Sequence, residues 1–413
     1  MKGNICLSGD KSISHRALMI ASLINDQSEI YNLSNADDVL TTIECLKECR
    51  IAVKMLKNNC IAIKGGSLAS PLKILDCRNS GSTARMMLGL LAGQGIDASF
   101  TGDSSLLNRP MKRIIDPLNR MGLKIKSNNM MLPISISKSK LNPLDYKINT
   151  KSAQVKSSLI LAGLGCEDYS KISFNSATRD HTEKLLKFLN FNIDINNRIK
   201  IKKTSITSGF KLTVPGDISS ASFLIAAAVL LPKSHIIIRN VLYNKTRLGF
   251  VDVLKRMNAN ISITNINKTN FEWTCTINAR YSPDLNSINI SERDTIRMID
   301  EIPILSVVAT QCRGKTIIKG VQELRYKESN RLHLICKNLT LMGAHINCIN
   351  NSIIIDGGNK LHNTTIDHGG DHRIAMSFEV LNLIINKSLS NKYSKIIGIS
   401  FPDFYNIFRN IIK

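Results

Sequence analysis

One short stretch near the start of the chain concentrates side chains that could bind an anion. Residues 9–18 read GDKSISHRAL, so a lysine, two serines, a histidine and an arginine stand where an apolar, helix-like run begins. The first N–H groups of a helix have no partner within it, and the helix dipole makes this end positive. Lys11 and Arg16 would add full charges, and Ser12 and Ser14 would add hydroxyl donors. The alternative is a serine N-cap with solvated basic neighbours, which needs no ligand.

Other expected helix starts in the first half carry similar chemistry on different residues. In RNSGSTAR, Gly81 would let a ligand approach the backbone closely. In NRPMKR, Arg109 precedes a proline at an expected helix start, and SATRDHTE contains a partial capping pattern. If these segments pack side by side, we expect their helix starts to converge on one cleft. The residues concerned are Asn79, Ser80, Gly81, Ser82, Arg109, Ser152, Gln154, Thr178, Arg179 and Glu183.

The second half adds dense clusters of charge in RYKESNR, GGDHR and MIDEIP. Arginine suits carboxylate and phosphate bidentately, whereas lysine acts as a movable point charge or a proton donor. A carboxylate at a helix start can serve as a cap alone, but Asp300 among cationic groups would be a base held ionised beside an anionic substrate. The clusters comprise Arg325, Lys327, Glu328 and Arg331, then Asp371, His372 and Arg373, and also Asp300 and Glu301.

Several common site motifs are missing from the sequence. No Gly-x-Gly-x-x-Gly follows an expected strand, and no P-loop, His-Glu-x-x-His or Gly-x-Ser-x-Gly motif occurs. DHGGDHR could hold a metal through His368, Asp371 and His372, but no second set of ligands accompanies it. The sequence therefore predicts no metal site.

The chain is basic, with 55 Lys+Arg against 32 Asp+Glu and a formal net charge of +23. A nucleic acid, a membrane surface or small anionic substrates would fit this charge, and so would a general enrichment in lysine. No basic stripe is interleaved with aromatic residues, and Trp273 lies in a strand-like run, so a nucleic-acid platform is disfavoured. No signal peptide or membrane-spanning run is recognisable. The ten scattered cysteines predict free, buried thiols in the cytoplasm.

A repeated pattern of elements indicates the fold class. Six segments open with small or charged residues and become apolar, as in RNSGSTARMMLGLLAG and GDISSASFLIAAAVLL. Amphipathic helices such as HTEKLLKFLN follow them, and Ile/Val-rich strands bounded by glycine or asparagine lie between. This pattern predicts an α/β protein of two domains with three repeats each. We expect one domain over 9–215 and another over 216–413, the latter including the strand in 1–8.

The ordered set of motifs resembles the EPSP synthase family of the bacterial type. It comprises GDKSISHR, NSGSTAR, NRPMKR, SAQVKSSL, TRDHTE, IDEIPIL, LRYKESNR and GDHRIAMSF, spread over nearly the whole chain. The resemblance implies an inside-out α/β barrel, the enolpyruvyl transferase fold, built of six βαβαββ units. It also implies transfer of the enolpyruvyl group of phosphoenolpyruvate to the 5-hydroxyl of shikimate 3-phosphate in aromatic amino acid biosynthesis. No cofactor and no metal are expected, and we expect a monomer without nucleic-acid or membrane partners.

The resemblance also assigns roles by motif position. Shikimate 3-phosphate is expected to contact Lys11, Ser12, Arg16, Ser152, Ala153, Gln154, Arg179, Asp300 and Lys327. Phosphoenolpyruvate is expected to contact Lys11, Gly81, Arg109, Gln154, Arg331 and Arg373. Asp300 is the expected base, and Glu328 or Lys11 the expected acid, in an addition–elimination reaction through a tetrahedral adduct. We also expect the domains to close on the substrates.

Some positions depart from the family pattern, and two rival functions remain. Ser82 replaces a usual threonine, Asn330 a usual aspartate, and Ile399 a lysine that some members have; the N-terminus is also shorter than usual. UDP-N-acetylglucosamine enolpyruvyl transferases share the fold, but they need an asparagine where this chain has Ser12 and usually have a loop cysteine. A basic, non-catalytic nucleic-acid-binding protein is the other rival, and only the net charge supports it.

Overall fold

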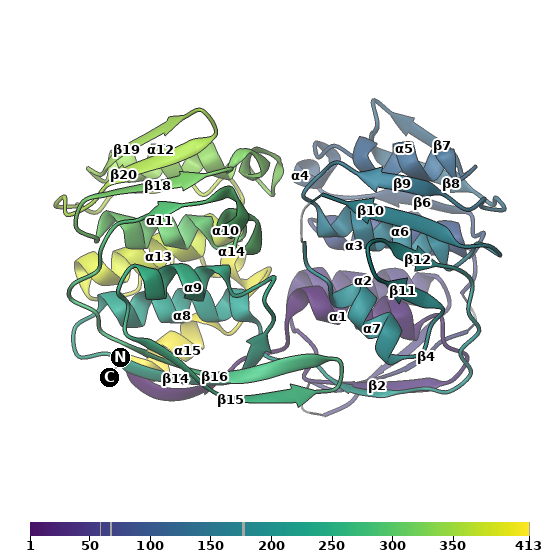
Figure 1. The fold of residues 1–413 in the computed structure, drawn as a ribbon, viewed down its shortest axis with the longest axis horizontal. Helices are drawn as coiled ribbons and strands as arrows, with labels where there is room; N and C mark the ends of the chain where they lie inside the picture. The colour runs from purple at the N-terminus through teal and green to yellow at the C-terminus, as the bar shows by residue number, and fades with distance from the viewer. Residues whose placement is uncertain (58, 67, 176–177, 413) are drawn as a thin grey trace. The chain divides into compact units, whose positions relative to one another are not determined.

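Two compact units make up the chain (Figure 1). The computed structural model describes residues 1–57, 59–66, 68–175 and 178–412. One unit is continuous, Gly9–Val214; the other combines Met1–Ser8 with Pro215–Lys413 and is called the two-segment unit below. The chain therefore passes from one unit to the other twice, after residue 8 and after residue 214.

The continuous unit contains three four-stranded sheets, ordered β13-β2-β4-β3, β5-β6-β8-β7 and β11-β12-β10-β9. Its helices are α1 (Lys11–Ala21), α2 (Asp37–Glu48), α3 (Gly81–Gly93), α4 (Ser104–Leu107), α5 (Lys112–Arg120), α6 (Ala153–Gly163) and α7 (His181–Phe188). Its strands are β2 (Gln27–Tyr31), β3 (Ala52–Met55), β4 (Ile61–Lys64), β5 (Leu75–Asp76), β6 (Ala98–Thr101), β7 (Lys124–Asn128), β8 (Met131–Ser137), β9 (Asp145–Ile148), β10 (Ser170–Phe174), β11 (Ile193–Ile195), β12 (Ile199–Ile201) and β13 (Lys211–Thr213).

The two-segment unit contains two four-stranded sheets, ordered β1-β14-β16-β15 and β17-β18-β20-β19. Its helices are α8 (Ile218–Leu230), α9 (Gly249–Arg256), α10 (Glu292–Arg297), α11 (Ile302–Thr310), the 3-10 helix η1 (Gln322–Tyr326), α12 (Arg331–Leu341), α13 (His372–Asn386), α14 (Ser394–Gly398) and α15 (Phe404–Ile411). Its strands are β1 (Lys2–Cys6), β14 (His235–Tyr243), β15 (Ile261–Thr269), β16 (Glu272–Arg280), β17 (Asn289–Ile290), β18 (Lys315–Lys319), β19 (His345–Ile349) and β20 (Ser352–Asp356).

All five sheets have the same construction. An edge strand pairs in parallel with the second strand, the second pairs antiparallel with the third, and the third pairs antiparallel with the fourth, as in β5-β6-β8-β7. More exposed and more buried side chains alternate along the strands, for example in β8 and β20, so one face of each sheet packs on helices. This recurrence bears out the repeats expected from the sequence.

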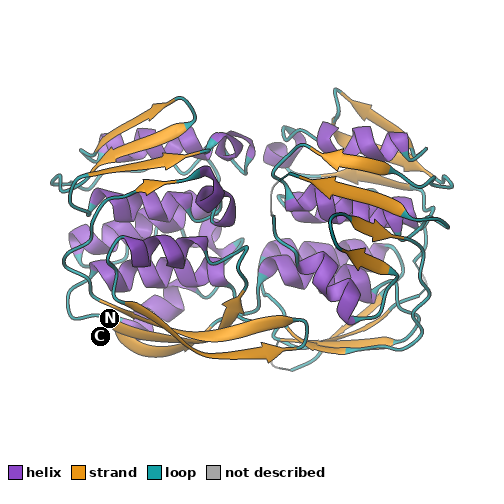
Figure 2. Cartoon of the chain, in the orientation of Figure 1, coloured by secondary structure: helices purple, strands orange, loops and turns teal. Residues whose placement is uncertain are grey.

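The predicted small-to-apolar segments form the central helices of both units. The six segments become α1, α3 and α6 in the continuous unit, and α8, α11 and α13 in the two-segment unit. These helices are buried along most of their length, and every residue of α11 is buried. In one unit α3 packs on α1 and α6, and in the other α8, α11 and α13 pack on one another. Within each unit of Figure 2 the helices lie together with strands beside them, because helices that are apolar all round need cover on every side.

The sixth repeat differs from the complete βαβαββ unit that the family resemblance implied. Helix α13 is followed by α14 and α15, and no strand is assigned in the described residues after β20. Two strands also pair in a different unit from the helix that follows them in the chain: β1 precedes α1 but pairs with β14, and β13 precedes α8 but pairs with β2. The described chain therefore has five sheets, not six.

The prediction for the cysteines is wrong at three positions. Cys336 of α12 and Cys348 of β19 form a disulfide, and Cys6 is exposed, whereas the remaining seven are free and buried. The pairing is possible because β19 follows α12 directly and packs against it. No described helix is long and apolar enough to cross a membrane.

Candidate active site

The start of α1 holds Lys11 in an ion pair. Asp10 caps the helix by accepting a hydrogen bond from the Ile13 N–H at 3.0 Å, so the cap is an aspartate and not the serine considered above. Lys11, the first helical residue, donates from Nζ to Asp38 Oδ2 at 2.6 Å. Asp38 lies in the first turn of α2, where a carboxylate also suits the helix dipole. The lysine charge is thus held at a helix start beside a fixed carboxylate.

Arg16 and Arg179 connect α1 with α6 and α7. The buried Arg16 donates to the Ser12 carbonyl at 2.7 Å, to Thr182 Oγ1 at 2.7 Å and to Ser157 Oγ at 2.8 Å. Arg179 donates to Ser12 Oγ at 3.0 Å. The Ser12 hydroxyl accepts this bond and keeps its own proton available for a ligand. Residues 176 and 177, the first two of the SATRDHTE stretch, lie outside the described residues.

Gly81 opens α3 between two arginines. Ser80 caps this helix by accepting from the Thr83 N–H at 3.2 Å. A Cβ atom on Gly81 would lie 2.5 Å from Arg85 NH1 and 3.3 Å from Arg109 NH1, so glycine leaves room beside both guanidinium groups. The sequence reasoning overlooked Arg85, although its position four residues after Gly81 on the same helix face was a usable signal.

Arg109 and Gln154 are fixed by bonds within the continuous unit. Arg109 NH2 donates to Asn79 Oδ1 at 2.8 Å and to Ser105 Oγ at 3.0 Å. Gln154 accepts from Arg85 NH1 at 2.9 Å and donates from Nε2 to Ser82 Oγ at 2.9 Å.

The start of α6 supplies a further cap. Ser152 is its N-cap and accepts from the Val155 N–H at 3.5 Å, and Ala153 is its first residue. Apart from Arg16 in the middle of α1, the predicted residues on α1, α3 and α6 therefore lie at or near helix N-termini.

Arg331 is the centre of the corresponding cluster in the two-segment unit. Its side chain is 0% exposed and donates to Asp371 Oδ2 at 2.7 Å, to Asp300 Oδ1 at 3.1 Å and to Glu328 Oε2. Burial alone would lower the pKa of Arg331, but Asp371, Glu328 and Asp300 outweigh it and raise that pKa above its ordinary value. Lys327 Nζ adds a second cation on Asp300 Oδ1 at 3.2 Å.

Arg373 stands in the first turn of α13. Asp371 caps this helix by accepting from the N–H groups of Arg373 and Ile374. Arg373 NH1 donates to the Asp300 carbonyl at 3.3 Å and lies 3.7 Å from Glu301 Oε1. The structure therefore brings Asp300, Lys327, Glu328, Arg331 and Arg373 together in one unit, and Lys11, Ser12, Arg16, Gly81, Arg109, Ser152, Ala153, Gln154 and Arg179 occur in the other.

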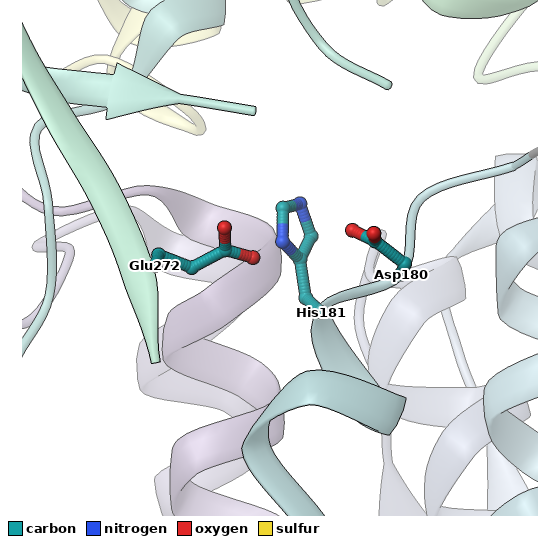
Figure 3. Close-up of side chains that lie close together, drawn as sticks. All are labelled: Asp180, His181 and Glu272. Carbon is teal, nitrogen blue, oxygen red and sulfur yellow. The ribbon is translucent and has the colours of Figure 1, made fainter. Parts of the chain in front are cut away.

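The carboxylates that could ligate a metal are already engaged. Asp371 of DHGGDHR accepts from Arg331, Ser329 and the α13 backbone, so it is a cap and an ion-pair partner. Figure 3 draws Asp180 and His181 at the start of α7 together with Glu272 of β16. Since Glu272 belongs to the other unit and the relative positions of the units are not determined, we assign no metal site to them. Within its own unit, Glu272 accepts two bonds from Asn244 Nδ2, at 3.1 and 3.0 Å.

Comparison with solved structures defines the class of protein. The chain superimposes on an EPSP synthase of Acinetobacter baumannii with a TM-score of 0.85 and 31% identity, covering 99% of this chain and 95% of that one. An enolpyruvyl transferase of Streptomyces tendae, NikO, shares the fold with a TM-score of 0.76 at 14% identity. The fold is therefore that of the enolpyruvyl transferases, which confirms the predicted fold class.

Sequence relatives define the family. The family model for EPSP synthase (3-phosphoshikimate 1-carboxyvinyltransferase) matches residues 1–408. Proteins named 3-phosphoshikimate 1-carboxyvinyltransferase are 40% identical in Persephonella marina, over 100% of this chain and 98% of the relative, and 40% identical in Thermodesulfovibrio yellowstonii, with the same coverage. The chain belongs to the EPSP synthase family and is a transferase, as the motif order predicted.

Proposed function

We infer that the chain carries out the reaction of its family. It transfers the enolpyruvyl group of phosphoenolpyruvate to the 5-hydroxyl of shikimate 3-phosphate and releases phosphate, as a step of aromatic amino acid biosynthesis. The observation that carries the mechanism is the environment of Asp300, whose Oδ1 accepts from both Lys327 and Arg331. Two cations on one carboxylate oxygen favour its ionised form, which a base requires.

Shikimate 3-phosphate is proposed to bind through side chains of both units. The support in the continuous unit is a set of donors at helix starts, with Ser12 already oriented by Arg179. Arg16 also orients this set, because its three nitrogen atoms donate to protein oxygens. The proposed contacts are Lys11, Ser12, Arg16, Ser152, Ala153, Gln154, Arg179, Asp300 and Lys327.

Phosphoenolpyruvate is proposed to bind beside Gly81 and the arginines. Its phosphate and carboxylate need several cations, and the guanidinium fork matches both groups bidentately. The missing Cβ of Gly81, next to Arg85 and Arg109, supports a close approach there. The proposed contacts are Lys11, Gly81, Arg109, Gln154, Arg331 and Arg373.

The chemistry proposed is addition followed by elimination. Asp300 accepts the proton of the 5-hydroxyl while the hydroxyl oxygen forms a bond to C2 of phosphoenolpyruvate. Glu328 or Lys11 delivers a proton to the methylene carbon. The residue that delivered the proton then takes one back from the new methyl group as the C2–O bond to phosphate breaks, which restores the double bond. The proton held by Asp300 leaves with the phosphate. Arginines already in place stabilise the charge on the departing phosphate without reorganising.

The remaining expectations for this chain are also proposals. We propose that it acts as a cytoplasmic monomer on two small substrates, without a metal, an organic cofactor, a nucleic acid or a membrane partner. The absence of a basic stripe interleaved with aromatics in the sequence supports the lack of a nucleic-acid partner.

Phosphate release tests the reaction. Purified protein is incubated with phosphoenolpyruvate and shikimate 3-phosphate, and in parallel with shikimate or UDP-N-acetylglucosamine in place of the phosphorylated acceptor. We expect phosphate only from the first mixture. Release with UDP-N-acetylglucosamine instead would identify the rival transferase and overturn the proposal.

A further inference from the structure

Glu301 is a buried acid that the mechanism does not use. Glu301 is 3% exposed, follows Asp300 directly, and occupies the N-cap position of α11. Its side chain makes no capping bond to that helix. A buried carboxylate is costly unless cations or donors compensate it, so its partners indicate why it is there.

Those partners connect Glu301 to two other helix starts. Oε1 accepts a hydrogen bond from the Ser219 hydroxyl of α8 and lies 3.7 Å from Arg373 NH1 of α13. The Ser219 oxygen in turn accepts from Arg247 NH2 at 2.9 Å. Oε2 is buried without a hydrogen-bond partner in the part of the chain that the structure describes. A chain of polar contacts therefore leads from Arg247 through Ser219 to Glu301 and ends at Arg373.

Arg373 and Arg331 differ in how many donors the protein uses. Every side-chain nitrogen of Arg331 donates to a carboxylate. Within the described residues, Arg373 donates from NH1 alone, so the rest of its guanidinium fork is available to an anion. An arginine held only at one nitrogen needs something to fix its direction, and the carboxylate of Glu301 is the charge beside that nitrogen.

We propose that Glu301 is a positioning residue that holds the Arg373 guanidinium in the orientation in which it binds phosphoenolpyruvate. This rests on the proposed function, because it requires that Arg373 contact that substrate. Ser219 orients the carboxylate, and Arg247, which also lies 3.8 Å from Asp217, fixes the Ser219 oxygen. Glu301 thus acts through Arg373 and touches neither substrate.

The test compares Glu301→Gln with a matched control. The amide keeps the volume and can accept from Ser219, but it removes the charge beside Arg373. We expect the KM for phosphoenolpyruvate to rise about tenfold, which lies within the usual coupling range of contacting residues, while the KM for shikimate 3-phosphate stays nearly constant. Glu301→Asp, which keeps the charge, should recover part of the loss.

Glu379→Gln is the control because Glu379 is equally buried and lies on α13, the same helix as Arg373. Its carboxylate accepts from the Ser390 hydroxyl and from the backbone of residues 390 and 391. We expect this variant to lower the melting temperature without changing the KM for phosphoenolpyruvate. If Glu301→Gln behaves like Glu379→Gln, Glu301 is structural and the proposal is overturned. Should Glu301→Gln not fold, Ser219→Ala replaces it, with a rise of about threefold expected in the same KM.

A double-mutant cycle with Arg373→Gln separates this proposal from the proposed function. If Glu301 acts through Arg373, adding Glu301→Gln to Arg373→Gln changes the KM for phosphoenolpyruvate little further. If instead the two substitutions raise the KM for phosphoenolpyruvate by factors that multiply in the double variant, Glu301 acts elsewhere, and the positioning role alone is overturned. An Arg373→Gln variant with an unchanged KM for phosphoenolpyruvate would instead remove Arg373 from the proposed binding set, and both proposals would fail.

Discussion

At the scale of single residues, Lys11 and Arg331 have carboxylate partners within their own units. Asp38 accompanies Lys11, and Asp300, Glu328 and Asp371 surround Arg331. A net charge of +23 for the whole chain therefore says little about the local charge of these clusters. Their carboxylates fix the cations in place and keep a base available, which a surplus of lysine alone would not do.

Asp300→Asn tests the base. Asparagine keeps the size of the side chain but cannot accept a proton at neutral pH, so we expect kcat to fall by about 10²- to 10⁴-fold. Binding of shikimate 3-phosphate, measured by calorimetry, should change little, because Lys327 keeps its charge. Asp367→Asn is a control, since Asp367 forms an ion pair with Lys337 in the same unit with both side chains substantially exposed. A kcat for Asp300→Asn within threefold of the parent would remove Asp300 from the role of base.

His15 predicts a pH dependence of stability. Burial, assisted by Lys11 and Arg16, lowers the pKa of His15 well below its usual value of 6.5. As the pH falls below about 6.5, the unfolded chain takes up a proton here while the folded chain does not, so the free energy of unfolding decreases. The slope from this group alone approaches about 1.4 kcal/mol per pH unit.

Denaturant unfolding between pH 7.5 and 5.5 measures that slope. We expect His15→Gln to lose most of this slope, although the variant is less stable overall because the hydrogen bond between Nδ1 and Thr42 Oγ1 is altered. Identical slopes for the parent and His15→Gln would mean that His15 titrates normally in the folded protein.

At the scale of elements, the six central helices could be predicted because the sequence carries both of their signals. Each begins after a capping or charged residue and becomes apolar, most completely in α8 and α11. The exchange of β1 and β13 could not be predicted in full, because pairing such as Lys2 with His235 depends on contacts between distant segments. The same limit applies to the site: the pairing of Asp38 with Lys11 depends on how α1 and α2 pack on each other, which the sequence does not show.

A buried ion pair between α6 and α7 provides a test of packing. Lys156 Nζ lies 2.6 Å from Glu183 Oε1, with side chains 1% and 3% exposed. Removing one charge, as in Glu183→Gln, leaves the other buried without compensation, so we expect a loss of about 3–5 kcal/mol in the free energy of unfolding. Replacing both by Lys156→Met and Glu183→Leu should cost much less than the single change.

The exposed pair Lys203–Glu167 is the matched control for this measurement. Glu167→Gln should cost less than about 1 kcal/mol, because solvent screens exposed pairs. Equal losses for Glu167→Gln and Glu183→Gln would contradict the argument from burial.

At the scale of the whole molecule, the continuous unit has what an independent domain needs. Its three sheets and its central helices all lie within Gly9–Val214, and even β13 finds its partner β2 there. We therefore expect a fragment of residues 9–214 to fold alone, with a cooperative thermal transition followed by circular dichroism. A fragment of residues 1–214 is the comparison, and the extra strand should add no stability because β14 is absent. A fragment 9–214 without cooperative unfolding would show that the unit depends on the rest of the chain.

The pairing of β1 with β14 also bears on how the protein is made. During translation, β1 is synthesised before the continuous unit and its hydrogen-bonding neighbour β14 only after it, a delay on the order of tens of seconds at ordinary elongation rates. Throughout that interval the nascent chain carries an unsatisfied strand edge, the kind of segment that associates with other polypeptides. Burial of this strand must wait until the ribosome has delivered β14.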